Sequence, residues 1–271
     1  MIICEIGKNF IDSEEVQPVS TNLEKAIELV RQAKEVGADV AKFQTHVSYD
    51  ELQKRSERRK DWILRNEQAT PFSIFWQPLK AYCDSIGIEF MTTPMSQDAV
   101  MLINSLVRRW KVGSADIVDM KMLREIKKTG KPVILSSGMS QTSEVEKAVE
   151  FFGNYDITLL HCVSIYPCPI KKINLGTIHY LKKKFPNVKI GFSDHTLSPL
   201  IPAYAVACGA EVIEKHFTLN RKAFGPDHKC SLMPNEFKRM VNNIRRMEKL
   251  LGDECKTYYQ EEVKYHKDFR V

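Results

Sequence analysis

Short apolar runs alternate with longer segments of helical periodicity along almost the whole chain. Residues 2–6 form the first run, and residues 21–36 then carry apolar side chains at the spacing of a helix that ends at Gly37. The same strand-then-helix order recurs to residue 251. Further strands are predicted at 39–45, 88–91, 109–112, 132–135, 157–163, 188–192 and 211–217. Further helices are predicted at 72–86, 97–106, 118–128, 143–152, 175–185, 200–208 and 234–251.

This alternation predicts an α/β fold built on a parallel sheet. About eight strand–helix units within roughly 250 residues match a (β/α)8 TIM barrel. An open doubly wound sheet is the alternative, but no Gly-x-Gly-x-x-Gly follows the first strand. Polar clusters also follow nearly every strand, as expected when all eight strand ends share one face. We therefore predict a single barrel over residues 1–255.

Two segments do not fit the alternation. The connection over residues 46–70 is long for a compact domain, which is typical of a functional lid. A surface excursion with its own short helix is an equal alternative. Residues 256–271 are polar and aromatic and lack the strand–helix pattern, so we interpret them as a C-terminal tail or the start of a linker.

Composition and charge narrow the class of protein. The chain has 271 residues, of which 43% are hydrophobic and 27% charged, and no apolar run is long enough to cross a bilayer. The N-terminus does not read as a signal peptide, and seven cysteines without paired spacing suit a reducing cytoplasm. The net charge is +6, but the sequence contains no recognisable nucleic-acid-binding module, so we expect the basic residues to lie on solvated faces. A mild positive charge also suits a small anionic substrate.

The last quarter of the barrel, residues 189–228, carries candidate metal ligands. His195 and His216 end two consecutive strands, and neighbouring strands lie about 4.8 Å apart, so both imidazoles can share one divalent ion. The alternative is that each histidine is a satisfied structural residue. Nearby polar residues that can support such ligands are Asp194, Glu214, Asp227 and, less clearly, His228.

Other strand ends carry groups suited to an anion and to acid–base chemistry. Lysine supplies a positive charge, hydroxyls donate hydrogen bonds, and a glycine lets backbone amides approach, although a single Ser or Thr here is often only a helix cap. Glu5 and Lys42 form a charged pair at a depth where core is expected, either as a structural ion pair or as functional groups. Lys42 is also a candidate Schiff-base lysine. The candidate anion ligands are Thr92, Thr93, Lys111, Ser114, Ser136, Ser137 and Gly138.

In order along the chain, these motifs resemble the sialic acid synthase family, and the resemblance spans nearly the whole sequence. The resemblance implies a (β/α)8 enzyme that condenses phosphoenolpyruvate with an N-acetylated hexosamine aldehyde to give a nonulosonic 2-keto-3-deoxy acid and phosphate. The motifs are Cys4-Glu5-Ile6-Gly7, Lys42-Phe43-Gln44-Thr45, Thr92-Thr93-Pro94, Lys111-Val112-Gly113-Ser114, Ser136-Ser137-Gly138-Met139, His161-Cys162-Val163-Ser164 with Tyr166-Pro167, and the groups around His195, His216 and Asp227.

The resemblance also implies roles for single residues. His195 and His216 would hold a divalent metal ion, with Mn²⁺ expected and Mg²⁺ or Co²⁺ as alternatives. The catalytic set would be Glu5, Lys42, Gln44 and Glu214. The substrate-binding set would be Thr92, Lys111, Ser114, Ser137, Tyr166, Ser193 and Asp227, of which Tyr166 and Asp227, like Glu5 and Glu214, face the sugar. A homodimer is expected on the same ground.

Two departures from the family pattern bear on the sugar. The family commonly has Asn-His after the first strand, where this chain has Asn9-Phe10. The family also carries a C-terminal antifreeze-like domain, and this sequence stops about where that domain would begin. Two other functions therefore stay open at this point: a Schiff-base aldolase using Lys42, and a non-catalytic barrel that binds a sugar phosphate.

Overall fold

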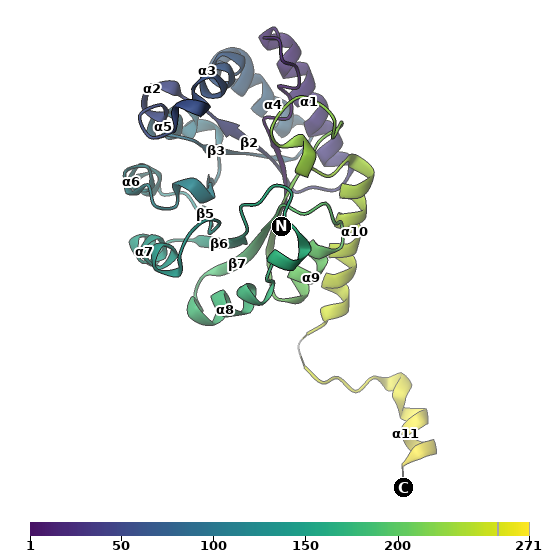
Figure 1. The fold of residues 1–271 in the computed structure, drawn as a ribbon. Helices are drawn as coiled ribbons and strands as arrows, with labels where there is room; N and C mark the ends of the chain where they lie inside the picture. The colour runs from purple at the N-terminus through teal and green to yellow at the C-terminus, as the bar shows by residue number, and fades with distance from the viewer. Residues whose placement is uncertain (254, 271) are drawn as a thin grey trace.

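The computed structural model describes residues 1–253 and 255–270. Its eight strands are all parallel and curl into a barrel with the helices outside (Figure 1). Hydrogen-bonded neighbours follow the order β3-β2-β1-β8-β7-β6-β5-β4, which confirms the predicted (β/α)8 fold. The strands are β1 (Ile2–Gly7), β2 (Val40–Thr45), β3 (Glu89–Pro94), β4 (Trp110–Val112), β5 (Val133–Ser136), β6 (Ile157–Cys162), β7 (Lys189–Asp194) and β8 (Val212–His216).

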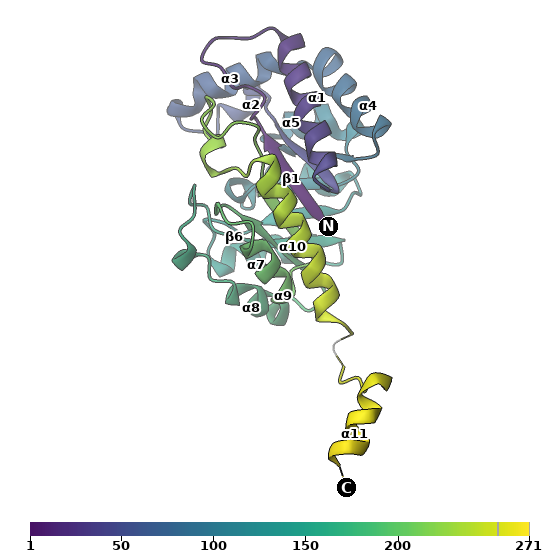
Figure 2. The same ribbon diagram turned by 90° about the vertical axis from the view of Figure 1, so that its right-hand side faces the viewer.

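Helices connect successive strands and cover the outer face of the sheet, as the side view shows (Figure 2). The predicted helix at 72–86 is divided into a π-helical turn, Phe72–Trp76, and α4. The predicted helix at 234–251 has the same bounds as α10. The principal helices are α1 (Val19–Glu35), α4 (Gln77–Ser85), α5 (Gln97–Ile103), α6 (Met120–Lys128), α7 (Thr142–Phe152), α8 (Gly176–Lys184), α9 (Ile201–Ala207) and α10 (Pro234–Leu251).

The strand residues alternate between the barrel interior and the helix-facing side, because successive side chains of a strand point to opposite faces. The outward set packs with the helices into the large apolar core. The inward set forms two layers. The lower layer is an apolar floor made by Ile3, Val40, Met91, Ile134, Leu160 and Val212. The layer above it, one step of two residues further along each strand, is polar: Glu5, Lys42, Thr93, Lys111, Ser136, Cys162, Ser193 and Glu214.

One glycine shows how closely the barrel strands approach. A Cβ placed on Gly191 of β7 would lie 2.5 Å from Leu160 Cδ2 and 2.5 Å from the carbonyl oxygen of Val212. Both neighbours belong to the strands on either side, and the Val212 oxygen is backbone that cannot move aside. Gly191 therefore lets β6, β7 and β8 pack at the floor of the barrel.

The long connection after β2 contains α2 (Ser48–Glu51), a 3-10 turn (Glu57–Arg59) and α3 (Lys60–Ala69). It matches the alternative of a surface excursion with its own short helices. One ionic clamp ties it to the turn after β4: Arg55 Nη2 donates to both carboxylate oxygens of Asp116 at 2.7 Å, and Lys54 Nζ donates to Asp119 Oδ2 at 2.8 Å. A lid motion of this segment stays a prediction.

Residues after α10 extend away from the barrel and include a second helix, α11 (Val263–Phe269) (Figure 1). The described residues from 255 to 270 bury no side chain. The sequence pattern missed this helix because its apolar residues face no partner. Among the described helices, none is both long and apolar enough to cross a membrane.

Candidate active site

A cavity of about 450 Å³ opens at the carboxyl ends of the strands. The upper, polar layer of the barrel forms its base, and loops after the strands form its walls. The structure brings most of the sequence-predicted site residues to this one cavity. Those that line it are Glu5, Lys42, Gln44, Lys111, Ser114, Tyr166, Ser193, His195, Glu214, His216 and Asp227.

Lys42 stands between two buried carboxylates at the base of the cavity. Its ammonium contacts Glu5 Oε2, lies 3.5 Å from Glu214 Oε2 and donates to Thr93 Oγ1 at 3.1 Å. Gln44 Nε2 donates to the other oxygen of Glu5 at 2.9 Å. Register explains the arrangement, because Glu5 of β1 pairs with Lys42 of β2 in the parallel ladder. The predicted Glu–Lys pair is therefore present at the centre of the cavity.

The environment pushes the two carboxyl groups in opposite directions. Burial raises the pKa of Glu5; Lys42 opposes this shift, Glu214 adds to it, and the net shift is upward. Burial also acts to raise the pKa of Glu214, but Lys111 and Lys42 outweigh it and hold the pKa at about 2. Glu214 is thus a fixed anion, whereas Glu5 is the group that can exchange a proton nearer neutral pH.

Burial disfavours the charge of Lys42, yet Glu214 and Glu5 outweigh burial and raise its pKa. A protonated amine is not a nucleophile. The geometry therefore favours a structural and electrostatic role for Lys42 over Schiff-base chemistry.

The opposite side of the cavity suits an anion. Lys111 Nζ donates to Ser136 Oγ at 2.7 Å and lies 3.6 Å from Glu214 Oε1. The backbone N–H of Gly138 donates to Ser114 Oγ at 3.1 Å. A Cβ on Gly138 would lie 2.2 Å from Ser164 Oγ and 2.7 Å from Ser114 Oγ, so only glycine leaves this space open. The Lys111 ammonium and the neighbouring hydroxyls together form an anion cradle.

Two predicted ligands lie outside the cavity. Thr92 is fully buried on the helix-facing side of β3, where its hydroxyl bonds to Thr45 Oγ1 at 2.8 Å. Ser137 donates to the Leu160 carbonyl at 2.9 Å and lines a neighbouring cavity. The reason is strand alternation: the inward positions are their neighbours, Thr93 and Ser136.

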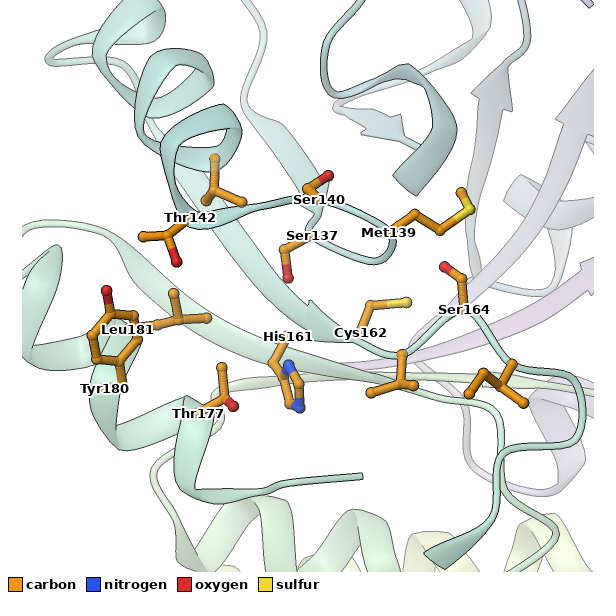
Figure 3. Close-up of a pocket in the computed structure, with 13 residues that line it drawn as sticks. Ser137, Met139, Ser140, Thr142, His161, Cys162, Ser164, Thr177, Tyr180 and Leu181 are labelled. Atoms are coloured by element: carbon orange, nitrogen blue, oxygen red, sulfur yellow. The ribbon is translucent and has the colours of Figure 1, made fainter. Parts of the chain in front are cut away.

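The neighbouring cavity, of about 390 Å³, has hydroxyl, sulfur and apolar walls and no Lys, Arg, Asp or Glu (Figure 3). In Figure 3, Ser137 and Thr142 lie on one side and Thr177 and Tyr180 on the other. The imidazole of His161 faces it and bonds through Nε2 to the Ile173 carbonyl at 2.7 Å. Because the Ile173 carbonyl can only accept, this bond makes Nε2 the donor and fixes the orientation of the ring.

His195 and His216 face one another, with ring centroids 5.4 Å apart. His195 Nδ1 donates to the Val163 carbonyl at 2.8 Å, which leaves Nε2 with a free lone pair, and His216 Nδ1 is buried without a hydrogen-bond partner among the described residues. Burial lowers the pKa of His216 to about 4, so its ring is neutral. Two imidazoles at this separation fit one divalent ion, because metal–nitrogen distances are about 2.1 Å.

No set of three or more His, Cys, Asp or Glu side chains placed to hold a metal occurs within residues 1–253 and 255–270. An ion between the histidines would therefore take further ligands from substrate or water. Tyr166 packs on His195 with centroids 4.0 Å apart and closes this side of the cavity.

Other expectations near the sugar end change with the structure. Phe10 does not face the cavity: it is buried in the outer core against Phe75, with ring centroids 5.0 Å apart. Asn9 Nδ2 donates to the Phe217 carbonyl at 2.7 Å, which is a structural bond. His228 is also structural, since its Nδ1 bonds to Thr218 Oγ1 at 2.7 Å. The departure at Phe10 therefore alters core packing and leaves the cavity wall untouched.

Thr93 and Ser136, both named as candidate anion ligands, do line the cavity. Sequence reasoning gave no role to several other residues that line it. Cys162 would have followed from period-two alternation, as the inward end of β6. Three more come from loops and carried no signal of their own in the sequence: Lys8, Arg59 and Lys229.

A sequence profile described as the NeuB family matches residues 29–256. The chain belongs to the NeuB family. It is 46% identical over 232 residues to the uncharacterized protein MJ1065 of Methanocaldococcus jannaschii, a match that covers 83% of this chain and 66% of that protein. It is 34% identical to the N,N'-diacetyllegionaminic acid synthase of Campylobacter jejuni, covering 97% of this chain and 81% of that one.

The structural comparison agrees with the NeuB assignment. The crystal structure of N-acetylneuraminic acid (sialic acid) synthetase from Leptospira borgpetersenii, in complex with citrate, superimposes with a TM-score of 0.88. That match has 31% identity and covers 99% of this chain and 92% of the other. The predicted resemblance to the sialic acid synthase family is thereby confirmed.

Proposed function

We propose that this NeuB-family chain condenses phosphoenolpyruvate with the aldehyde of an N-acetylhexosamine-like sugar. The product would be a nonulosonic 2-keto-3-deoxy acid, with release of phosphate. One observation carries the proposal: a single cavity holds an anion cradle at Lys111, the Glu5–Lys42–Glu214 centre and two facing histidines. A cavity of about 450 Å³ suits two small polar substrates held together.

The anion cradle would bind phosphoenolpyruvate. Lys111, Ser114 and Ser136 supply charge and hydroxyl donors on one side of the cavity, and the missing side chain at Gly138 leaves room for Ser114 and Ser164. The enol carbon C3 would then point toward the middle of the cavity, where the aldehyde lies. Holding both reactants in one site replaces a bimolecular encounter with an oriented reaction.

The reaction balances with water as the third reactant. C3 of phosphoenolpyruvate forms a bond to the aldehyde carbon, and positive charge builds at C2 opposite the fixed anion Glu214. Water adds at C2, and Glu5 is placed to accept its proton. The C2–O bond to phosphate then breaks as the ketone forms. The two water protons end on the new hydroxyl group and on the departing phosphate.

His195 and His216 would hold the divalent ion of this enzyme, with Mn²⁺ as the expected metal. When bound, such an ion supplies Lewis-acid polarisation of the aldehyde oxygen. Tyr166, stacked on His195, and Asp227 would then bound the sugar end. A homodimer is proposed from the resemblance alone, and light scattering of the purified chain tests it.

The deciding assay measures inorganic phosphate released from phosphoenolpyruvate with a panel of aldoses, in the presence of Mn²⁺. Release that requires one aldose, with a product mass equal to that aldose plus pyruvate, is the expected result. In ¹⁸O-labelled water the released phosphate should stay unlabelled, because water attacks carbon. Binding of phosphoenolpyruvate without release by any aldose would instead favour a non-catalytic binding barrel. A borohydride-trapped adduct on Lys42 would establish the aldolase alternative.

A further inference from the structure

A second buried ion pair lies behind the two facing histidines, on the helix-facing side of the sheet. Lys215 and Asp194 are 0% and 1% exposed, and Lys215 Nζ donates to Asp194 Oδ2 at 2.6 Å. Successive side chains of a strand point to opposite faces, and the preceding residues, Ser193 and Glu214, line the cavity. The ion pair therefore points away from the cavity and is outside the chemistry described so far.

Hydrogen bonds from this pair enclose the turn that carries His195. The ammonium of Lys215 also donates to the carbonyl oxygen of Thr196 and, at 3.4 Å, to its hydroxyl oxygen. The carboxylate of Asp194 accepts from the backbone N–H of Thr196 at 2.9 Å and from its hydroxyl at 3.0 Å. All three ammonium protons and both carboxylate oxygens thus have partners within one turn, at the residues on either side of His195.

The bridge lies where backbone pairing between β7 and β8 stops. Their ladder ends one residue before each of the two histidines. Among the described residues, no backbone hydrogen bond joins residues 195–197 to residues 216–218. Lys215 spans this gap, because its side chain starts on β8 and its Nζ donates to the carbonyl of Thr196.

Stability of the core does not by itself require charges at this position. Burial lowers the pKa of Lys215, and the charge of Asp194 opposes that shift. An apolar pair of similar volume is often as stable as a buried ion pair, because removing two ions from water costs about as much as their attraction returns. What an apolar pair cannot supply is the set of directed bonds that fixes the backbone around His195.

We propose that Lys215 and Asp194 are positioning residues for the metal centre, which they serve by fixing the backbone on both sides of His195. The inference rests on the proposed metal role of the two histidines and adds two residues that do not contact the ion. The ring of His195 keeps a centroid separation of 5.4 Å from that of His216. Ligands of one ion must be held to within about 0.5 Å, so a shift of this turn weakens metal binding.

The test is calorimetric titration of Mn²⁺ into the chain without substrates. Lys215→Met removes the bridge but leaves a buried carboxylate without its counterion. The double variant Asp194→Asn/Lys215→Met leaves no charge buried, and asparagine can still accept from the N–H of Thr196 and donate to its hydroxyl. We expect both variants to bind Mn²⁺ at least about tenfold more weakly than wild type, as is typical when residues that orient metal ligands are replaced.

Leu79→Ala is the matched control for a general loss of stability. Leu79 is fully buried in α4, which packs beside β3 on the other side of the barrel. This variant should unfold at a lower urea concentration than wild type, yet bind Mn²⁺ within about twofold of wild type. Co²⁺ adds a spectroscopic readout, because its visible absorption depends on ligand geometry. At saturating Co²⁺ the spectrum should change in the double variant and stay as in wild type in Leu79→Ala.

The outcomes separate the inference from the proposed metal site. A wild-type chain that binds no Mn²⁺, or His195→Asn and His216→Asn variants that bind it as wild type does, overturns the metal site and the inference with it. Weakened binding in the histidine variants, with wild-type affinity and Co²⁺ spectrum in the double variant, overturns the inference and leaves the metal site standing. Equal weakening in Leu79→Ala and the double variant also overturns the inference, because affinity would then follow overall stability.

Discussion

Replacing Lys42 with methionine removes the only ammonium that lies between Glu5 and Glu214 in the described structure. Methionine keeps most of the side-chain volume, so the change tests charge rather than packing. At 3.5 Å from Glu214 Oε2, one such pair is worth about 5 kcal/mol at an effective dielectric constant of about 20. Relief of lysine desolvation offsets part of this. We therefore expect the variant to lose about 3–5 kcal/mol of unfolding free energy at pH 8.

The loss should depend on pH in a defined direction. Glu5 already has a raised pKa in the folded protein, and without Lys42 the pKa rises further. The folded state then holds a proton that the unfolded state releases, so stability falls as pH rises from the unfolded value of about 4.5 through the raised folded pKa. The deficit of Lys42→Met relative to wild type should be smallest near pH 5 and largest above the raised pKa.

Urea unfolding followed by tryptophan fluorescence at pH 5.5 and pH 8 measures both quantities. Lys42→Arg is the matched control, since it restores a cation that cannot form a Schiff base and should recover at least half of the lost stability. A methionine variant as stable as wild type at pH 8 would refute the reasoning that Lys42 neutralises the two carboxylates. Activity retained by Lys42→Arg would further exclude an amine nucleophile at this position.

Three more predictions follow from single features. Gly138→Ala should raise KM for phosphoenolpyruvate about tenfold or more, because the new Cβ would lie 2.7 Å from Ser114 Oγ. Gly176→Ala is the control and should leave KM unchanged, because its Cβ would meet nothing nearer than 3.5 Å. His216→Asn should weaken Mn²⁺ binding measured by calorimetry without substrates by at least about tenfold, and unchanged affinity would remove His216 from the metal site. Removal of residues 254–271 should shift the thermal unfolding midpoint of the barrel by less than about 2 °C, because the described part of that segment buries no side chain; a larger drop would show that it packs on the barrel.

The fold was predictable because its signal is repeated. Each strand–helix unit carries an apolar run followed by an amphipathic segment, and most of these helices are followed directly by a glycine or end next to one, so an error at one boundary leaves the count of eight intact. The division at Phe72–Trp76 and the helix over Val263–Phe269 were not predictable in this way. The π-helical turn differs from the α-helix after it only in hydrogen-bond spacing, which a continuous apolar segment does not reveal. The helix over Val263–Phe269 packs no apolar face on a partner, and an apolar face is what hydrophobic periodicity detects.

The candidate site was predictable where strands carry it. Glu5, Lys42 and Lys111 stand at the inward positions of their strands, so chemistry and alternation agree. Thr92 and Ser137 failed because an offset of one residue sends a side chain to the other face of the sheet. The residue next to each, Thr93 or Ser136, has the same hydroxyl chemistry and faces the cavity, so residue type alone could not decide which of the two lines it.

The loop cations were beyond sequence reasoning for a different reason. Lys8 faces the cavity because Asn9 and Phe10 next to it are fixed in the core, and Arg59 does so because Arg55 is clamped to Asp116. Each depends on contacts between segments distant in sequence. A basic run such as that around Arg59 otherwise matches an ordinary solvated face.

The barrel is paired strand to strand except between β3 and β4, which no described ladder joins. Thr93 and Lys111 lie on the two sides of this seam, and both line the cavity. A substrate phosphate that contacts both residues would link β3 to β4, where the described structure has no backbone hydrogen bonds between the strands. Amide hydrogen exchange along Glu89–Pro94 and Trp110–Val112 should therefore slow on ligand binding more than exchange in the paired strands. Bound substrate would then supply the connection between β3 and β4 that the backbone of the free protein lacks.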